Sequence, residues 1–198
     1  MVWALSYRPK PDSYPSADIL EGNTGELELV DPTRDGGTNL AISRSFSGRR
    51  AKPESVPKVI RWNGRRKLLD YETSFRKTVS DRFRALIEEI EPGIHQFEPV
   101  RFVGKDGSDL GTRWFWQVCN RIDSVHRKLT NWVLLKGVIW TTQYGVEPQL
   151  VFDNQEIGRS KFWHDKHLSD GPFLSDEAKA CIEDAGMTGV HFHHFEQA

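Results

Sequence analysis

The stretch EPGIHQFEPVRFVGKDGSDLGTRWFWQVCNRIDSV, residues 91–125, decides the fold of this 198-residue chain. Pro92-Gly93 ends the helix that precedes it, because proline cannot continue a helix and glycine readily takes a positive φ. Two segments of β-forming residues follow, at 95–103 and 112–119, and Asp106-Gly107 between them is a strong hairpin-turn signal. The stretch therefore predicts the end of a helix followed by a long antiparallel hairpin.

The helix before the hairpin is predicted over residues 78–93. Ser80 is its expected N-cap, and apolar residues recur at helical spacing along one face. A second helix is predicted over residues 174–186, with Ser175 as its N-cap. A short helical turn is expected after the cap residue Asp153.

The remaining β-forming segments predict further strands. Residues 132–140 form a nearly continuous apolar run, long enough for a central strand. Asn63-Gly64 predicts a second hairpin between residues 56–62 and 65–70, since both turn positions tolerate a positive φ. Other strands are expected at residues 26–31, 38–43, 149–153 and 189–195.

Together these elements predict an α+β fold in a single domain, with a largely antiparallel sheet, two main helices and an irregular N-terminal arm. The first 25 residues are rich in Pro, Ser, Gly and Asp, which favours irregular chain. We therefore assign residues 1–50 to the arm and the first strands, and residues 51–198 to the α+β domain.

Composition and charge narrow the class of protein. No apolar run is long enough to cross a membrane, and no secretory signal is expected at the start. The two cysteines lie 62 positions apart and make no disulfide framework, so a reducing cytoplasm is the expected location. The net charge is −1, but residues 43–67 hold nine basic side chains against Glu54 alone, a local charge of +8.

Two chemical interpretations of the polar residues compete. A nucleic-acid-binding module would use the basic segment 44–67, yet the chain lacks the positive overall charge and the reader motif of such modules. A thiol hydrolase would use Cys119 with a histidine such as His95, yet nothing near Cys119 in the sequence lowers its pKa. Asn120 and Asp123 are then expected to bind nearby backbone.

Histidines and tryptophans raise two further questions. His164 and His167 are three positions apart and more histidines crowd residues 189–195, but zinc needs three or four converging ligands, so no metal and no cofactor are predicted. Trp114 and Trp116 share one face of a predicted strand. That face is either core or an interface, because tryptophan is enriched at binding hot spots.

Several motifs point in their order and spacing to one family. They are Glu91-Pro92-Gly93 at the helix end, His95-Gln96-Phe97, Pro99-Val100, Asp106-Gly107, Asn120 with Asp123, Leu150-Val151-Phe152-Asp153, and Trp163 with Asp165-Lys166. In these motifs the chain resembles the immunity proteins numbered family eleven in bacterial polymorphic toxin systems, formerly a domain of unknown function. The resemblance covers roughly residues 55–195, and the first 50 residues depart from it.

The resemblance implies a protein made beside a secreted toxin, of the polymorphic or type VI kind, which it binds and neutralises in the cytoplasm of the producing cell. It implies no catalytic residues, because such families act by binding. The partner would be the toxin domain of the effector. No membrane is expected to take part, and nucleic acid is the less favoured partner. The oligomeric state stays open.

Tight binding of a toxin requires an anchor cluster and complementary charge. We predict nine candidate residues for the toxin interface: Trp114, Trp116, Glu98, Asp106, Asp109, Asp123, His126, Trp163 and Asp165. The acidic ones suit a toxin with a basic surface. The predicted function is that of an immunity protein, with an antidote hydrolase and a nucleic-acid module as the alternatives.

Overall fold

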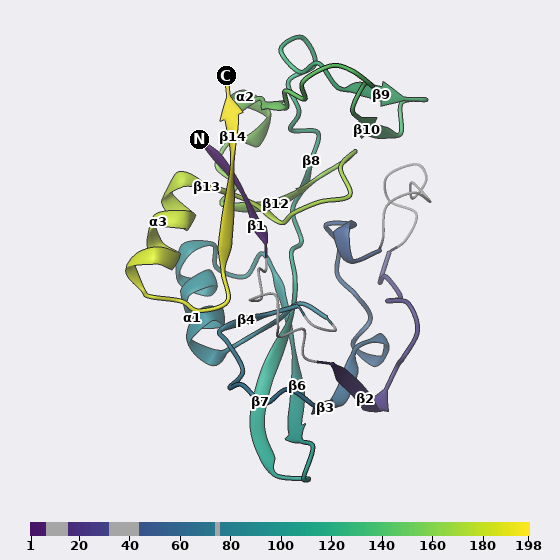
Figure 1. Ribbon diagram of the computed structural model, residues 1–198, viewed down its shortest axis with the longest axis vertical. Coiled ribbons are helices and arrows are strands. Elements are labelled where there is room, and N and C mark those ends of the chain that lie inside the picture. Colours follow the sequence, from purple (N-terminus) through teal and green to yellow (C-terminus); the bar gives the residue numbers. More distant parts are fainter. Residues whose placement is uncertain (7–15, 32–43, 74–75) are drawn as a thin grey trace.

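The chain forms two six-stranded sheets, one above the other in Figure 1, in a computed structural model. The structure describes residues 1–6, 16–31, 44–73 and 76–198. Its mixture of helices and strands confirms the predicted α+β class. The strand expected at residues 38–43 lies outside the described residues.

The lower sheet is built around the predicted hairpin. Its strand order is β2-β3-β6-β7-β5-β4. The strands are β2 (Ala17–Gly22), β3 (Pro57–Trp62), β4 (Tyr71–Glu72), β5 (Thr78–Val79), β6 (Gln96–Gly104) and β7 (Asp109–Gln117). The β6–β7 hairpin is confirmed: its strands pair antiparallel from Gln96 opposite Gln117 outward, and Gly104 N donates to Ser108 O at 2.7 Å to close the turn.

The two predicted main helices form over shorter spans than predicted, and both of their N-caps are confirmed. The helix α1 (Asp81–Ile90) begins at Ser80, whose Oγ accepts from Phe83 N at 3.2 Å. The helix α3 (Asp176–Asp184) begins at Ser175, whose Oγ accepts from Ala178 N at 3.2 Å. A third, four-residue helix, α2 (Asn154–Ile157), is capped by Asp153. Of the helices in the described part of the chain, none is both long and apolar enough to cross a membrane.

The upper sheet contradicts the expectation of an irregular N-terminal arm. Its order is β11-β14-β1-β13-β12-β8, so β1 (Val2–Ser6) lies between two other strands. The rest of the sheet consists of β8 (Arg121–Ile122), β11 (Val151–Phe152), β12 (Phe162–Asp165), β13 (Phe173–Ser175) and β14 (His191–Gln197). The first residues were predicted as irregular because a five-residue strand carries almost no periodic signal.

The sheets are mixed rather than simply antiparallel. Three pairings are parallel: β3 with β6, β8 with β12, and β11 with β14. The other pairings among the described strands, including the long hairpin, are antiparallel. Strand β6 can pair parallel to β3 because the segment between them, with β4, β5 and α1, is long enough to return the chain to the end of the sheet at which β3 begins.

The predicted central strand at residues 132–140 is wrong. The segment forms two short strands, β9 (Val133–Leu135) and β10 (Ile139–Thr141), which among the described strands pair only with each other. Lys136 and Gly137 both have positive φ, 50° and 70°, and reverse the chain between them. The apolar run was therefore a small hairpin with exposed residues, among them Val133 and Leu135.

The hairpin predicted around Asn63-Gly64 is also wrong. Strand β3 has β2 along one edge and β6 along the other, so no edge is left for residues 65–70. Asn63 instead binds β2, since its Nδ2 donates to Asp18 Oδ2 at 2.9 Å. The strand expected at residues 26–31 is reduced to a single bridge between Leu29 and Ala51.

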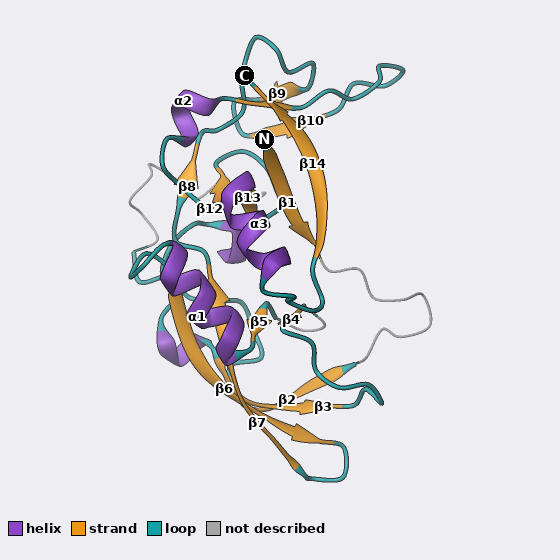
Figure 2. Ribbon diagram, turned by 90° about the vertical axis from the view of Figure 1, so that its left-hand side faces the viewer, coloured by secondary structure: helices purple, strands orange, loops and turns teal. Residues whose placement is uncertain are grey.

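The two sheets share one hydrophobic core at their junction. Figure 2 shows α1 over the β6–β7 hairpin and α3 beside β1 and β13, and the two helices contact each other. The buried side chains of this cluster come from both sheets, and the rings of Trp116 (β7) and Phe162 (β12) meet edge to face at 5.6 Å. Leu5 of β1 belongs to the same cluster.

The place of β1 in this core predicts a measurable cost for a change in the first residues. Leu5 is 3% exposed, so Leu5→Ala should lower the free energy of unfolding by about 2–4 kcal/mol through lost burial and a residual cavity. Leu20 is 47% exposed, and Leu20→Ala is the control, with an expected change within about 0.5 kcal/mol. Urea unfolding measures both, and equal effects would place residues 1–6 outside the core.

Candidate functional site

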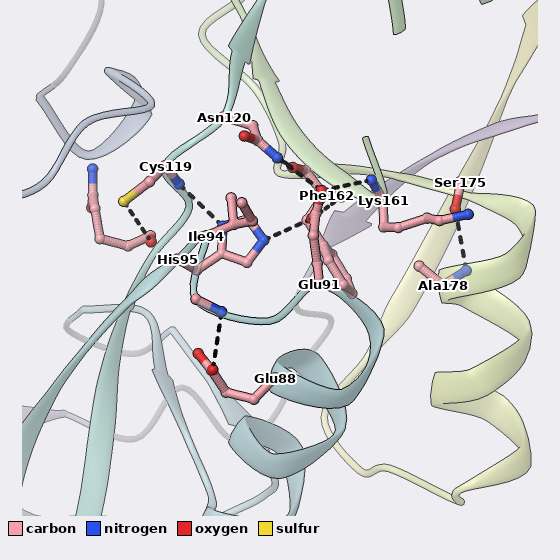
Figure 3. Close-up of polar contacts among 12 residues, drawn as sticks. Glu88, Glu91, Ile94, His95, Cys119, Asn120, Lys161, Phe162, Ser175 and Ala178 are labelled. Atoms are coloured by element: carbon pink, nitrogen blue, oxygen red, sulfur yellow. Dashed lines mark hydrogen bonds and ion pairs between the residues drawn. The ribbon is translucent and has the colours of Figure 1, made fainter. Parts of the chain in front are cut away.

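The residues first suspected of thiol chemistry form a partly buried polar joint between the sheets (Figure 3). Glu91, the residue at which α1 ends, accepts four hydrogen bonds. Two come from side chains, His95 Nε2 at 2.9 Å and Asn120 Nδ2 at 3.0 Å. Two come from the backbone of the upper sheet, Lys161 N at 3.2 Å and Phe162 N at 3.1 Å. Asn120 Nδ2 also donates to Phe162 O at 3.0 Å, so one cluster connects the end of α1, the segment between β7 and β8, and β12.

The protonation of His95 follows from its partners. The backbone N–H of Cys119 donates to His95 Nδ1 at 3.2 Å, so Nδ1 acts as an acceptor and carries no proton. The proton of the neutral ring is therefore on Nε2, from which it is donated to Glu91. The ring is 4% exposed and packs edge to face against Trp116 and Phe162.

The thiol of Cys119 is not activated by this histidine. Its Sγ donates to Gln117 O at 3.3 Å, while His95 binds the cysteine backbone instead. Burial raises the pKa of Cys119 to about 11, and Arg50 offsets only part of that effect. A nucleophilic cysteine needs the opposite shift. The geometry therefore gives no support to a Cys119–His95 hydrolase.

The charge of Glu91 is stabilised by its donors. Burial alone would raise the pKa of this carboxyl, but the hydrogen bonds, foremost that of His95, outweigh it and lower the pKa below its usual value. A buried carboxylate is tolerated only when its lone pairs are filled, as these are. The sequence offered no local sign of this role, because the donors Asn120, Lys161 and Phe162 are far away along the chain.

A second buried group was also missed. Lys77 Nζ lies 4.3 Å from the centre of the Phe46 ring, and the same ring meets His164 edge to face at 5.1 Å. Burial lowers the pKa of Lys77 to about 7, against an opposing effect of Asp170. Burial, followed by Lys77, lowers the pKa of His164 well below its usual value. These residues meet only through tertiary contacts, so no sequence pattern marked them.

Three of the nine predicted interface residues are corrected by their burial. Trp116 is 1% exposed, and Trp163 and Asp165 are fully buried. Trp163 Nε1 donates to Ser124 Oγ at 3.1 Å, and Asp165 accepts from Ser124 N at 2.8 Å and from His167 N at 2.7 Å. Burial raises the pKa of Asp165, although these hydrogen bonds oppose it. All three are structural residues, because a side chain without accessible surface cannot contact a partner.

Trp114 is half-buried and held by the start of α1. Its Nε1 donates to Asp81 Oδ1 at 2.6 Å, and the Arg84 guanidinium lies 3.7 Å from the ring centre. The tryptophan face of β7 is therefore covered by α1, whereas Phe115 fills the core on the opposite face. On this face Trp116 lies in the core, whereas the half-buried Trp114 stays a candidate for the interface.

The other candidates lie on separate surfaces. Asp106 and Asp109 are exposed near the tip of the hairpin, where Ser108 donates to Asp106 and Gly111 to Asp109. Glu98 lies near the other end of β6, away from the tip. Asp123 and His126 line a distant pocket of about 370 Å³ together with Asp153 and Glu156. The structure therefore does not bring the candidates into one patch.

The predicted structural use of two polar residues is partly confirmed. Asn120 does bind backbone, at Phe162 O, although that partner is distant in the sequence. Asp123 pairs instead with the Arg127 side chain at 2.7 Å. Among the residues that the structure describes, no group of three or more His, Cys, Asp or Glu side chains is placed to hold a metal ion.

The basic segment is used mostly inside the fold. Its side chains that donate to backbone carbonyls or pair with carboxylates are Arg44, Arg49, Arg50, Lys52, Lys58, Arg61 and Arg66. Arg50, for instance, donates to Gly93 O at 3.2 Å and so fastens the segment to the end of α1. Arg65 and Lys67 are exposed. Most of the local charge of +8 thus has structural partners.

The comparison with known protein families gives the class of protein. A family model described as the immunity protein family Imm11 matches residues 34–197, so the chain belongs to the Imm11 immunity protein family. No curated protein matches the chain.

The role of Glu91 predicts a specific loss of stability. Glu91→Gln places an amide group among four donors and should lower the free energy of unfolding by about 2–3 kcal/mol at neutral pH. Glu88→Gln is the control, because Glu88 is near in sequence and accepts only one bond, from Gly93 N at 3.3 Å. A cost for Glu91→Gln no greater than for Glu88→Gln in chemical unfolding would contradict the role of the joint.

The lowered pKa of Glu91 adds a pH dependence. A group whose pKa is lower in the folded state stabilises the fold above its unfolded pKa, and this stabilisation is lost as the pH falls through the folded pKa. The difference between wild type and Glu91→Gln should therefore be full at neutral pH and shrink below pH 4.5, the unshifted value. Urea unfolding at a series of pH values measures it, and a difference that grows in acid would refute the assignment.

The raised pKa of Cys119 is testable by alkylation. In a Cys181→Ser background, the rate of Cys119 with iodoacetamide should rise about tenfold per pH unit from about pH 7 to pH 10, because only the thiolate reacts. Mass spectrometry of the labelled protein gives the rate. A plateau below about pH 8 would indicate an activated thiol and revive the hydrolase hypothesis.

Proposed function

We propose that this chain binds a cognate bacterial toxin and neutralises it in the cytoplasm of the cell that makes both. The observation that carries the proposal is the family match over residues 34–197. The partner is the toxin domain of a secreted effector, of the polymorphic or type VI kind. The protein acts by forming a complex rather than by chemistry on the toxin.

The structure supports a binding role in two ways. The Cys119 thiol has a raised pKa and its neighbour His95 is committed to the Glu91 joint, so the best catalytic candidates are in use as structure. The two sheets are fixed to each other through a shared core, which provides rigid surfaces. A rigid surface loses little conformational entropy on binding and so suits tight complexes.

The proposal is tested with the toxin encoded beside this protein. Expression of that toxin alone should kill the host, co-expression of this chain should restore growth, and the two proteins should co-purify in a fixed ratio. Cys119→Ala should protect as well as the wild type, which separates inhibition by binding from an antidote hydrolase. Killing that is equal with and without the chain would refute the proposal.

A further inference from the structure

We propose that the groove between the loop after β3 and the tip of the β6–β7 hairpin binds an acidic segment of a protein partner. The groove has a volume of about 770 Å³, which is large enough to hold several side chains. Residues 64–68 form one wall, residues 104–112 line the other, and Arg113 lies at the inner end. The inference rests on the proposed function for the identity of the partner, a toxin, and not for the chemistry of the groove.

The first wall is held rigid by a buried carboxylate. Glu72 is 2% exposed, and its two oxygens accept from Arg66 Nη1 at 2.5 Å and Nη2 at 3.0 Å. The backbone N–H of Leu69 donates to the same carboxylate at 2.9 Å, and Trp62 Nε1 donates to Arg66 O at 3.0 Å. The loop after β3, where a hairpin was expected, is therefore held in place by contacts within the fold. A partner that binds there does not have to order it.

The second wall is the hairpin tip, which Figure 1 shows at the lower end of the molecule. Asp106 accepts from Ser108 N at 3.1 Å and from Ser108 Oγ at 2.6 Å, which fixes the turn. Leu110, on this wall, is 41% exposed. Lys105 is exposed beside it.

The inner end of the groove carries a fixed positive charge. Arg113 is 6% exposed, and its Nη2 donates to Leu69 O at 2.5 Å and to Asp70 O at 3.0 Å. Its buried Nε has no hydrogen-bond partner among the described residues. Trp62 and Leu68 supply apolar lining.

The charge that the groove leaves free is positive. Asp81 and Asp106 are its two carboxylates, and they keep their negative charges although they accept hydrogen bonds from Trp114 and Ser108. Against them stand four cations, Arg65, Lys67, Lys105 and Arg113, besides Arg66, which pairs with the buried Glu72. The exposed cations Arg65, Lys67 and Lys105 have neither a hydrogen bond nor an ion pair within the described parts of the chain. Free cations around an apolar lining match a segment that carries both carboxylates and an apolar side chain.

A polypeptide fits this groove better than a nucleic acid does. The net charge of the chain is −1, and most of the basic segment is paired within the fold. Nucleic-acid binding draws on a long positive surface that neutralises many phosphates. Three free cations around a single groove suit a short acidic segment instead.

The test uses a short synthetic peptide of alternating Glu and Leu, titrated at low salt and followed by calorimetry. The wild type should bind it and should ignore the peptide in which Gln replaces Glu. Arg65→Glu/Lys67→Glu/Lys105→Glu should weaken binding about tenfold or more. The control Lys128→Glu/Arg159→Glu/Lys166→Glu makes the same change in net charge at exposed residues outside the groove and should bind like the wild type.

Three results would overturn the proposal: no binding of the Glu peptide by the wild type, an equal loss in both triple variants, or tighter binding of a single-stranded oligonucleotide than of the peptide. Thermal unfolding checks that the variants fold. The milder Arg65→Gln/Lys67→Gln/Lys105→Gln gives the same comparison if the reversed variant unfolds.

Co-purification with the toxin separates this proposal from the proposed function. If the wild type and both triple variants retain the toxin equally, the toxin lies elsewhere and the groove proposal falls while the immunity function stands. If the wild type itself fails to retain the toxin, the immunity function falls and the peptide titration alone decides on the groove. Loss of the toxin from the groove variant alone supports both.

Discussion

The carboxylate of Glu91 is the group on which the two halves of the molecule depend. It accepts at once from the hairpin side, through His95 and Asn120, and from the upper sheet, through Lys161 and Phe162. A desolvated carboxylate is costly unless its acceptor sites are filled, so the two sheets cannot shift apart without exposing that cost. The contact between Trp116 and Phe162 beside it adds apolar burial to the same junction. Hydrogen bonds and apolar packing therefore hold the two sheets together at the same place.

This arrangement explains how a set of polar residues can resemble a catalytic site in the sequence and yet have a structural role in the fold. The imidazole of His95 has one nitrogen on a backbone N–H and the other on a carboxylate, so neither is available to a thiol. The basic segment follows the same logic, because most of its cations fasten loops to carbonyls. The cations of this segment that have no partner within the described fold lie at the surface, where they line the groove beside Glu72.

The sequence predicted those features whose physics is local. The caps Ser80, Ser175 and Asp153 and the Asp106-Gly107 hairpin depend on contacts within a few residues, and all are present. The wrong strand predictions arose because strands compete for neighbours in the sheet, and this competition leaves no local pattern in the sequence. Asn63-Gly64 is a good turn sequence, but β3 already has two neighbours.

For the candidate site, too, the sequence predicted the local features and missed those that depend on tertiary contacts. Trp114 and Trp116 share a face by strand geometry, but only packing shows that α1 covers it. The lack of a lowered pKa at Cys119 could be anticipated from the sequence, because no basic residue or helix start directly precedes it. The four donors of Glu91 could not, since three of them belong to segments that meet α1 only in the folded chain.

The central place of β1 has a kinetic consequence. Its partners are β13 and β14, so Val2 lies opposite Ser175 and Phe195, almost the whole length of the chain away. Contacts of such long range slow folding and cannot form until the last strands have been synthesised. The upper sheet is therefore completed only after translation has passed β14. Under the proposed function, protection of the cell would therefore begin only after β1 has paired with β13 and β14.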